Sequence, residues 1–544
     1  MSKTIKQHIA GLKKILTLNK YAFLIAGICS ALAGYLVSKA VVFNADAISN
    51  IFMFQSGFSF HDFRLADWHT SILKFPILIL QALFPLDINT FTVWVILTLL
   101  ATILLWSHAV SLMLGRRFFA PTAIIMSLIT LASLRFTIEI SLITIRNLEF
   151  GIFLYLLILF WKLITQKKRA SQKKYILSWA LYAAGASLLF ASDPYFIYAM
   201  IPAQLIAGVL YFYQKKIRLQ TLAALTLITL APALLSKLLL IFLKTIGVYS
   251  YAGSSLSPPL YQFEQLGASL WQAIHDLMLL FNANFFGMNI GPGLLVSLIL
   301  FGLLLISLGA FFKSFRNIAA LAAAKPVYAT LLISAGIMFT IYILTFSLSR
   351  SFRYISLLVF ILPVLFLVFF DTFKYPAFLS KKHISTTALV AAFLIIPILY
   401  LQTVKQYTAL DFFDYRDNKA TIQGLTKTLT AHGVDGVIAE HNYAAPIHFW
   451  SQSTIKSIPT TQCKDRLPFL VRSSWYDQAH YSKVALIVDP KEHNSALPTS
   501  ECNLDTLIKR FGEPIETFTT TGYKGAPLDG YVFNPEVISA IKNN

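Results

Sequence analysis

The sequence predicts a polytopic α-helical membrane protein that carries a small α/β domain after its last membrane helix. Of its 544 residues, 56% are hydrophobic and 13% are charged, and the mean hydropathy is +0.66. Soluble domains are about one-quarter charged. Apolar runs of roughly 20 residues, the length that spans a bilayer as a helix, recur as far as Leu401. Beyond Leu401, shorter apolar segments alternate with polar ones, which is typical of a water-exposed domain.

Apolar runs of spanning length indicate about eleven transmembrane helices. Their predicted ranges are 21–42, 88–112, 118–137, 149–165, 176–193, 194–213, 219–243, 291–312, 328–347, 354–372 and 385–402. The first begins after Lys20 and continues past the length of a signal-peptide core, so we expect an uncleaved signal anchor.

The positions of lysine and arginine predict the orientation of these helices. If the helices alternate, every basic cluster falls on one side, and cytoplasmic loops are the ones that carry such an excess. The clusters are 13–20, 115–119, 162–174, 214–218, 313–316 and 374–382. This predicts a multi-pass protein of a bacterial-type cytoplasmic membrane, with the N-terminus in the cytoplasm and the C-terminal domain outside. The clusters also explain much of the net charge of +20, so no nucleic-acid partner is expected.

The segment 403–544 is expected to form an extracytoplasmic α/β domain. Helices are predicted over 418–433 and 503–512, each ending at a glycine. Strands are predicted over 435–440, 483–490 and 530–535. The alternation of the two types favours an α/β layer structure.

Two cysteines, Cys463 and Cys502, lie in this domain, whereas Cys29 lies in the first helix. In an oxidising exterior the first two are candidates for a disulfide, with a pair of free thiols as the alternative.

The predicted outer loop 43–87 concentrates acids directly after the first apolar segment. Asp46 comes first, and Asp62 and Asp67 follow, with His61 and His69 beside them. The apolar stretch 71–85 is short for a span and fits a helix that lies at the membrane interface. The histidines and acids show no strong metal-ligand spacing, so no metal site is expected. Each acid also has an ordinary alternative as a solvated turn or helix-capping residue.

Further charged residues fall on the predicted outer side of the bundle. Charges at membrane depth are costly and usually face a cavity or a partner, and arginine's planar fork suits a phosphate. The candidates are Asp193, before a proline between two helices, and Arg146, Glu149, Lys237, Arg350 and Arg353. Helix capping is the alternative for Asp193, and interfacial anchoring is the alternative for Arg350 and Arg353.

The order of these segments resembles the C-type-fold (GT-C) membrane glycosyltransferases, including protein mannosyltransferase-like and aminoarabinose transferase-like proteins. The resemblance rests on "FNADA" (43–47), "LKFPILILQALFP" (73–85), "GRRFF" (115–119) and "IRNLEFGIFLYLLILF" (145–160), and covers about residues 20–215. It departs from the family where a second acid often follows the first, because Asp46 is followed by Ala47. Only "LKFP" represents the Lys-Pro-Pro that often opens the interfacial helix.

The resemblance implies transfer of a sugar from a polyprenyl-phosphate carrier to a glycan, lipid or protein acceptor on the outer face, with the lipid-linked sugar as donor substrate and no certain cofactor. Asp46 would be the general base on the acceptor hydroxyl, with Asp67 and Asp193 as further catalytic candidates. Arg350 or Arg353, with Arg146, Glu149 and Lys237 nearby, would bind the substrate and its phosphate. The outer loop 247–290 has a Gly/Ser/Pro-rich start and an amphipathic helix, which fits either a lid or a plain connector.

Two other functions remain open. A transporter, flippase or polymerase-type protein would use the same arginines on lipid-linked glycans. Such a protein would show internal repeats or broken helices, and the sequence indicates neither. A non-enzymatic envelope protein would instead bind glycan through the aromatic stretches 443–452 and 472–481, whose rings are otherwise core or loop residues.

Overall fold

The computed structural model divides the chain into two units, each built from segments that are distant in the sequence. The helical unit contains 1–37, 95–238 and 255–406, and the sheet unit contains 38–94, 239–254 and 407–544. The residues that the structure describes are 3–41, 48, 62–66, 89–141, 147–165, 172–246, 250–251, 263–345, 354–371, 381–409, 415–461, 463–467, 471–488, 502 and 504–541.

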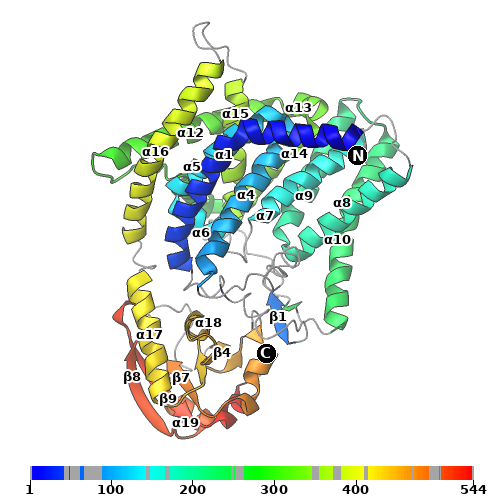
Figure 1. Cartoon of the computed structure of the whole chain (residues 1–544). Coiled ribbons are helices and arrows are strands. Elements are labelled where there is room, and N and C mark those ends of the chain that lie inside the picture. Colours follow the sequence, from blue (N-terminus) through cyan, green and yellow to red (C-terminus); the bar gives the residue numbers. More distant parts are fainter. Residues whose placement is uncertain are drawn as a thin grey trace. The chain divides into compact units, whose positions relative to one another are not determined.

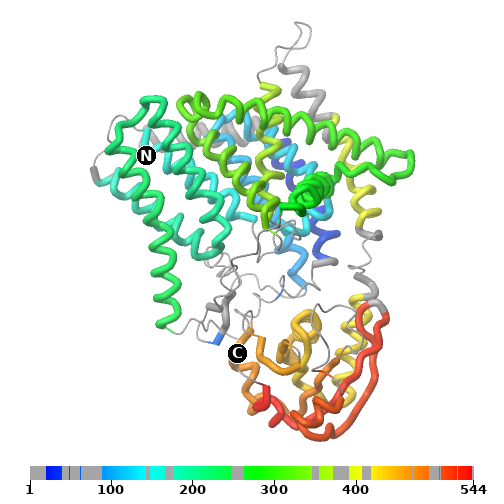
Figure 2. The backbone as a smooth tube through the Cα atoms, turned by 180° about the vertical axis from the view of Figure 1, so that it is seen from behind, coloured from blue at the N-terminus to red at the C-terminus, as the bar shows by residue number. Residues whose placement is uncertain are grey.

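Eight helices in the described part of the chain are long and apolar enough to cross a membrane, which indicates a membrane protein. Their apolar stretches lie in α1 (Lys3–Val41), α4 (Phe91–Leu114), α7 (Leu148–Thr165), α8 (Gln172–Ser192), α9 (Tyr195–Tyr213), α10 (Leu219–Thr245), α12 (Pro292–Arg316) and α14 (Pro326–Leu344). Two shorter apolar helices are α15 (Ser356–Asp371) and the stretch Phe393–Gln406 of α16 (Lys381–Ala409). Figures 1 and 2 show α7, α9 and α14 side by side, in agreement with their packing contacts.

The predicted continuous helix over 118–137 is wrong, because the chain breaks there. The stretch Arg116–Ala132, whose main part is α5 (Phe119–Ala132), is bent by 106° from α6 (Leu134–Ser141). Polar side chains of α16 satisfy backbone groups that the break frees. Gln406 Oε1 accepts from the Leu134 N–H at 3.3 Å, Gln406 Nε2 donates to the Ala132 carbonyl at 3.4 Å, and Thr403 donates to the Leu131 carbonyl. Such partners are what allow a broken helix inside an apolar bundle.

A few polar bonds connect neighbouring helices of the helical unit. Trp161 Nε1 of α7 donates to Thr330 Oγ1 of α14 at 2.8 Å. Tyr182 of α8 bonds Gln204 of α9, and both are fully buried. Arg117 Nη2 lies 2.5 Å from Asp371 Oδ2 at the end of α15. Arg117 is near the start of the bent pair, the name used here for the stretch Arg116–Ala132 together with α6. If successive helices cross the membrane in alternating directions, the two residues joined by each of these bonds lie at the same depth in the bilayer.

The C-terminal part of the sheet unit is α/β, with a six-stranded sheet ordered β5-β4-β3-β7-β9-β8. The strands are β3 (Gly436–Ala439), β4 (Lys456–Thr461), β5 (Asp465–Arg466), β7 (Val484–Val488), β8 (Glu516–Thr521) and β9 (Pro527–Phe533). Strands β4, β3 and β7 are parallel neighbours, whereas β9 and β8 pair antiparallel. The helices are α17 (Tyr415–Ala431), α18 (His441–Trp450) and α19 (Leu504–Phe511).

Glycine ends both helices that the sequence predicted in this domain. Gly433 follows α17 with φ 68°, and Gly512 follows α19 with φ 80°, a conformation that glycine adopts without a Cβ penalty. Strands β3, β7 and β9 occur within a few residues of their predicted ranges, whereas β4, β5, β8 and α18 were not predicted.

A second, three-stranded sheet joins three segments that are far apart in the sequence. β1 (Phe63–Ala66) pairs parallel with β2 (Ser250–Tyr251) and antiparallel with β6 (Val471–Arg472). The predicted outer loop 43–87, the segment after α10 and the C-terminal domain therefore share one backbone ladder. Because hydrogen-bonded strands must lie in the same compartment, β1, β2 and β6 lie on one side of any membrane that the helices cross.

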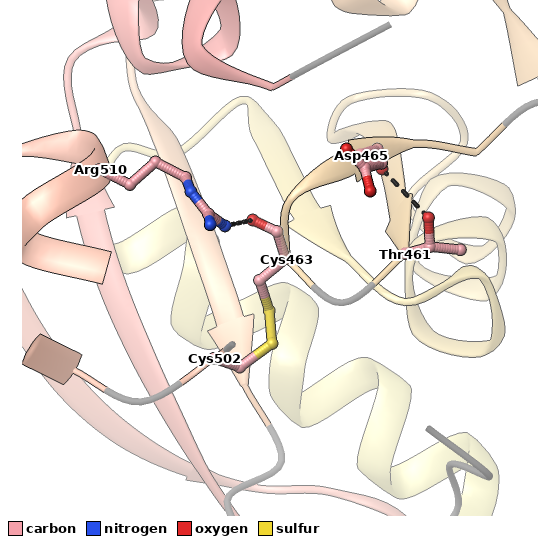
Figure 3. The surroundings of a disulfide bond; sticks show 5 residues. All are labelled: Thr461, Cys463, Asp465, Cys502 and Arg510. Carbon is pink, nitrogen blue, oxygen red and sulfur yellow. Dashed lines mark hydrogen bonds between the residues drawn. A yellow bond between two sulfur atoms is a disulfide. The ribbon is translucent and has the colours of Figure 1, made fainter. Parts of the chain in front are cut away.

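A disulfide joins Cys463 to Cys502 in the sheet unit, with Cα atoms 5.6 Å apart (Figure 3). Arg510 Nη1 of α19 donates to the Cys463 carbonyl at 3.4 Å, so Cys463 is connected both to Cys502 and to α19. Cys463 has φ 53°, and the disulfide and hydrogen bond hold its backbone in this uncommon conformation for a non-glycine residue.

Candidate functional site

The turn between α8 and α9 places Asp193 inside the helical unit. The turn consists of Asp193 and Pro194 alone, and Asp193 is 4% exposed. Its Oδ1 accepts from the Tyr195 backbone N–H at 2.9 Å. The bond spans two residues and closes a turn immediately before α9, whose N-cap residue is Pro194. It satisfies a backbone N–H at the start of the helix and fixes the position of the carboxylate.

The start of α7 holds a second buried acid. Glu149 is 5% exposed, and its Oε2 accepts from the Asn147 N–H at 3.0 Å. The Asn147 side chain, fully buried, accepts from the Leu148 N–H at 2.6 Å. A carboxylate in the first turn also interacts favourably with the positive end of the helix dipole.

Aromatic rings bring these two helix starts together and connect them to α15. The ring of Phe150, next to Glu149, lies 6.4 Å from that of Tyr195 and 4.7 Å from that of Phe360 on α15. The Tyr195 hydroxyl donates to the Tyr354 carbonyl at 3.4 Å, two residues before α15 begins. The starts of α7, α9 and α15 therefore converge. We call Asn147, Glu149, Asp193, Tyr195 and Tyr354 the polar cluster.

The sequence did not single out Asp276, a buried acid near this end of the bundle. It lies on α11 (Leu266–Leu280), is 2% exposed and accepts from the Tyr342 hydroxyl of α14 at 2.6 Å and from Gln272 Nε2 at 2.7 Å. Ser269 Oγ also donates to the Ile343 carbonyl at 2.6 Å. These bonds hold α11, the described helix of the predicted outer loop 247–290, against α14. This attachment favours a fixed connector over a mobile lid as the role of that helix. The signal in the sequence was a single acid within the apolar stretch of an amphipathic helix.

The remaining predicted site residues are placed differently. Lys237 is exposed on α10. Asp46, Asp67, Arg146, Arg350 and Arg353 lie outside the described residues, as do His61, His69 and the predicted interfacial helix 71–85. Glu149 and Asp193 are thus the two predicted site residues that the described structure brings to one region. No group of three metal-ligating side chains that could hold an ion occurs in the described part of the chain.

Asp62 is held by the C-terminal domain within the sheet unit. Its Oδ2 accepts from Arg472 Nε and from Ser474 Oγ, and its Oδ1 accepts from the Ser474 N–H, each at 2.6 Å. Burial raises the pKa of Asp62, but the bonds from Ser474 and Arg472 outweigh it and hold that pKa below its usual value. We call these three residues the Asp62 clamp. Its geometry indicates a structural role, because both carboxylate oxygens are engaged.

Most aromatic side chains of the stretches 443–452 and 472–481 are buried in the C-terminal domain, whereas Trp450 is partly exposed. Tyr443, Phe449, Trp475, Tyr476 and Tyr481 are each no more than 8% exposed. The hydroxyl of Tyr476 donates to the Pro459 carbonyl, and that of Tyr481 donates to the Trp475 carbonyl, each at 2.6 Å. These rings form core contacts, which is the alternative that the sequence offered for them.

No protein-family model matches the chain, and no curated protein matches it.

Proposed function

We propose that the protein is a membrane glycosyltransferase of the GT-C type, which transfers a sugar from a polyprenyl-phosphate carrier to an acceptor on the outer face of the cytoplasmic membrane. The observation that carries this proposal is the convergence of two buried carboxylates, Glu149 and Asp193, at the joined starts of α7, α9 and α15. Buried acids in an apolar bundle are costly and mark a functional site.

The polar cluster supplies the parts that this reaction needs. A carboxylate can accept the proton of the acceptor hydroxyl as the sugar–phosphate bond breaks. Tyr354 directly follows Arg353 in the sequence, so the predicted phosphate-binding arginine is one residue from the cluster. A guanidinium stabilises the charge that develops on the leaving phosphate. Asp46 remains our first choice for the base on the sequence resemblance, and Asp193 is the candidate within the described structure.

The three-stranded sheet supports the topology that this function requires. The described part of the chain has eight apolar helices of spanning length, and the eleven spans expected from the sequence require that the bent pair and the two shorter apolar helices cross the membrane as well. With the bent pair counted as one span, an even number separates β1 from β2, and an even number separates β2 from β6. All three strands then lie on the outer side, together with the C-terminal domain. A reporter fused after Asn544 tests this arrangement: it should be active only outside the cytoplasm.

The decisive experiment measures sugar transfer by purified variants with matched expression. Asp46→Asn and Asp193→Asn keep side-chain size and hydrogen bonding but remove the proton acceptor. Replacing the base should lower transfer by about 10²–10⁴-fold. Asp276→Asn is the matched control, since it changes a buried acid that already bonds Tyr342 and Gln272. Unchanged transfer in both Asp46→Asn and Asp193→Asn would contradict the proposal for these acids and shift attention to Asp67 and Glu149.

One observation favours the transporter or flippase as a second candidate. The 106° break between α5 and α6 is the kind of broken helix that the sequence did not indicate and that transporters use near their substrate sites. Purified protein in liposomes distinguishes the two functions: movement of a labelled polyprenyl-phosphate sugar across the bilayer, without transfer to any acceptor, would favour the transporter.

A further inference from the structure

A cavity opens at the far ends of α12 and α15, away from the helix starts that form the polar cluster. Its volume is about 430 Å³, and its walls come from α12, α13 (Ile318–Ala324) and α15. Figure 1 shows these three helices near one another in the helical unit. The volume falls in the range of roughly 300–1,000 Å³ that small-ligand pockets occupy.

The lining of the cavity combines apolar side chains with one exposed lysine. Ala310, Leu321, Leu365 and Val368 form apolar walls, with Lys313, Ser314 and Asn317 as the polar part. The Lys313 amine lies 5.9 Å from the centre of the ring of Phe369, which also lines the cavity. A ligand with an anionic head and an apolar body would match both halves of this lining.

Positive charge around the cavity is not balanced by acids. Arg316 and Lys325 flank α13, and both are exposed, as is Lys313. The sequence contains no aspartate or glutamate between Asp276 and Asp371. Asp371 already pairs with Arg117, and among the described residues no carboxylate lies within salt-bridge distance of the three cations at the cavity. The basic cluster 313–316 also predicts that this end of the bundle faces the cytoplasm.

We propose that this cavity binds the phosphate headgroup of an anionic phospholipid from the cytoplasmic leaflet. Lys313 contacts the phosphate, Arg316 and Lys325 supply long-range attraction, and the walls of α12 and α15 receive the upper part of an acyl chain. Basic pockets between membrane helices on the cytoplasmic side bind anionic lipid headgroups in this way. The lipid site is separate from the proposed transferase site, and the proposal of a lipid site does not depend on the proposed transferase function.

Native mass spectrometry of the full-length protein tests the site with phosphatidylglycerol as the probe. Lys313→Ala should weaken retention of this lipid about five-fold, since a basic residue near an anionic membrane surface is worth roughly 1 kcal/mol. Ala320→Trp, which narrows the cavity without changing charge, should also weaken retention. Lys173→Ala is the control, because Lys173 is an exposed lysine of another predicted cytoplasmic cluster and does not line the cavity.

Three further measurements make the outcome decisive. Phosphatidylcholine should bind equally to all variants, and millimolar inorganic phosphate should not displace phosphatidylglycerol. Equal losses in Lys173→Ala and Lys313→Ala would overturn the site in favour of general surface attraction. Displacement by inorganic phosphate would overturn the lipid assignment in favour of a free-anion site. Unchanged binding in Lys313→Ala and Ala320→Trp, with melting temperatures like the native protein, would overturn the proposal entirely.

Discussion

Asp62 in the sheet unit is partly buried and Asp276 in the helical unit is fully buried, and the partners of the two carboxylates differ in kind. Asp62 pairs with the Arg472 guanidinium and two donors of Ser474. Asp276 accepts from the neutral groups of Tyr342 and Gln272, and His275 Nδ1 lies 3.9 Å from its Oδ1. An ion pair is stronger than a hydrogen bond to a neutral group. It is also costlier to break, because removing one partner leaves the other charge without a counter-charge. The comparison predicts that the sheet unit responds more to mutation, reduction and acid than the helical unit.

Reduction of the disulfide should produce the largest change in the sheet unit. Cys463 and Cys502 are separated by 39 residues, and closing a loop of this size stabilises a fold by about 4 kcal/mol in the chain-entropy model. Thermal unfolding with and without a reducing agent, followed by hydrogen exchange in peptides from β3 and β7, measures the effect. A Cys463→Ser, Cys502→Ser double variant should be insensitive to the reductant. Equal loss of protection in α7 would contradict the prediction that the sheet unit responds more strongly than the helical unit.

Breaking the Asp62 clamp should come next. Arg472→Ala leaves the Asp62 carboxylate without its cationic partner, so we expect a loss of about 3 kcal/mol in the free energy of unfolding of the sheet unit. Hydrogen exchange at β1 and β6 should rise most, because the clamp joins these strands. Lys427→Ala is the control, since Lys427 is exposed on α17. A change in Arg472→Ala no larger than in Lys427→Ala would show that β1 is held by backbone pairing alone.

Acid should destabilise the sheet unit through His448. This ring is buried on α18, where its Nδ1 accepts from the Ser457 N–H at 3.1 Å. Burial, with the charges of Arg472 and Lys456, lowers the pKa of His448 to about 3. The unfolded chain, with an ordinary pKa of about 6.5, binds the proton more readily. Stability is therefore complete above about pH 6.5 and falls by about 1.4 kcal/mol per pH unit below it, or about 2 kcal/mol at pH 5.

Hydrogen exchange of β3 and β4, corrected for the intrinsic effect of pH, follows this loss. In His448→Asn, which keeps an acceptor for Ser457, the pH dependence between 6.5 and 5 should disappear. The Asp62 clamp adds a separate loss at lower pH: its carboxylate has a lowered pKa, so its contribution is present above about pH 4 and is lost as the pH falls through that lowered pKa. A flat profile in the native protein would contradict the buried neutral histidine.

The smallest effect is expected in the helical unit. Tyr342→Phe removes the hydroxyl that bonds Asp276 and should lower stability by about 1 kcal/mol, the scale measured for single hydrogen bonds between membrane helices. Thr340→Ala, on the same helix with only a local bond to the Gly336 carbonyl, is the control. Thermal unfolding in detergent measures both. A loss above about 3 kcal/mol would show that Asp276 is bound as tightly as Asp62 and would remove the contrast between the units.

Local patterns in the sequence determined much of the secondary structure. The apolar runs gave the positions of the long helices, because a helix across a bilayer needs about 20 apolar residues whatever packs against it. Gly433 and Gly512 end their helices as predicted, because positive φ is a property of the residue itself. A turn role for Asp193 was equally readable from its position before a proline, and its side chain closes a turn before α9.

Tertiary structure decided the features that depend on distant residues. The break at Ser133 is stable because Thr403 and Gln406, some 270 positions later, satisfy its carbonyls and N–H groups. Strand β1 exists only as a partner of β2 and β6, and such short strands carry no periodicity of their own. Asp62 and Arg472 are 410 residues apart, and Asp276 and Tyr342 are 66 apart. The sequence therefore determined which residues are helical and apolar, whereas folding alone decided which charged groups meet, because pairing depends on distances that local spacing does not encode.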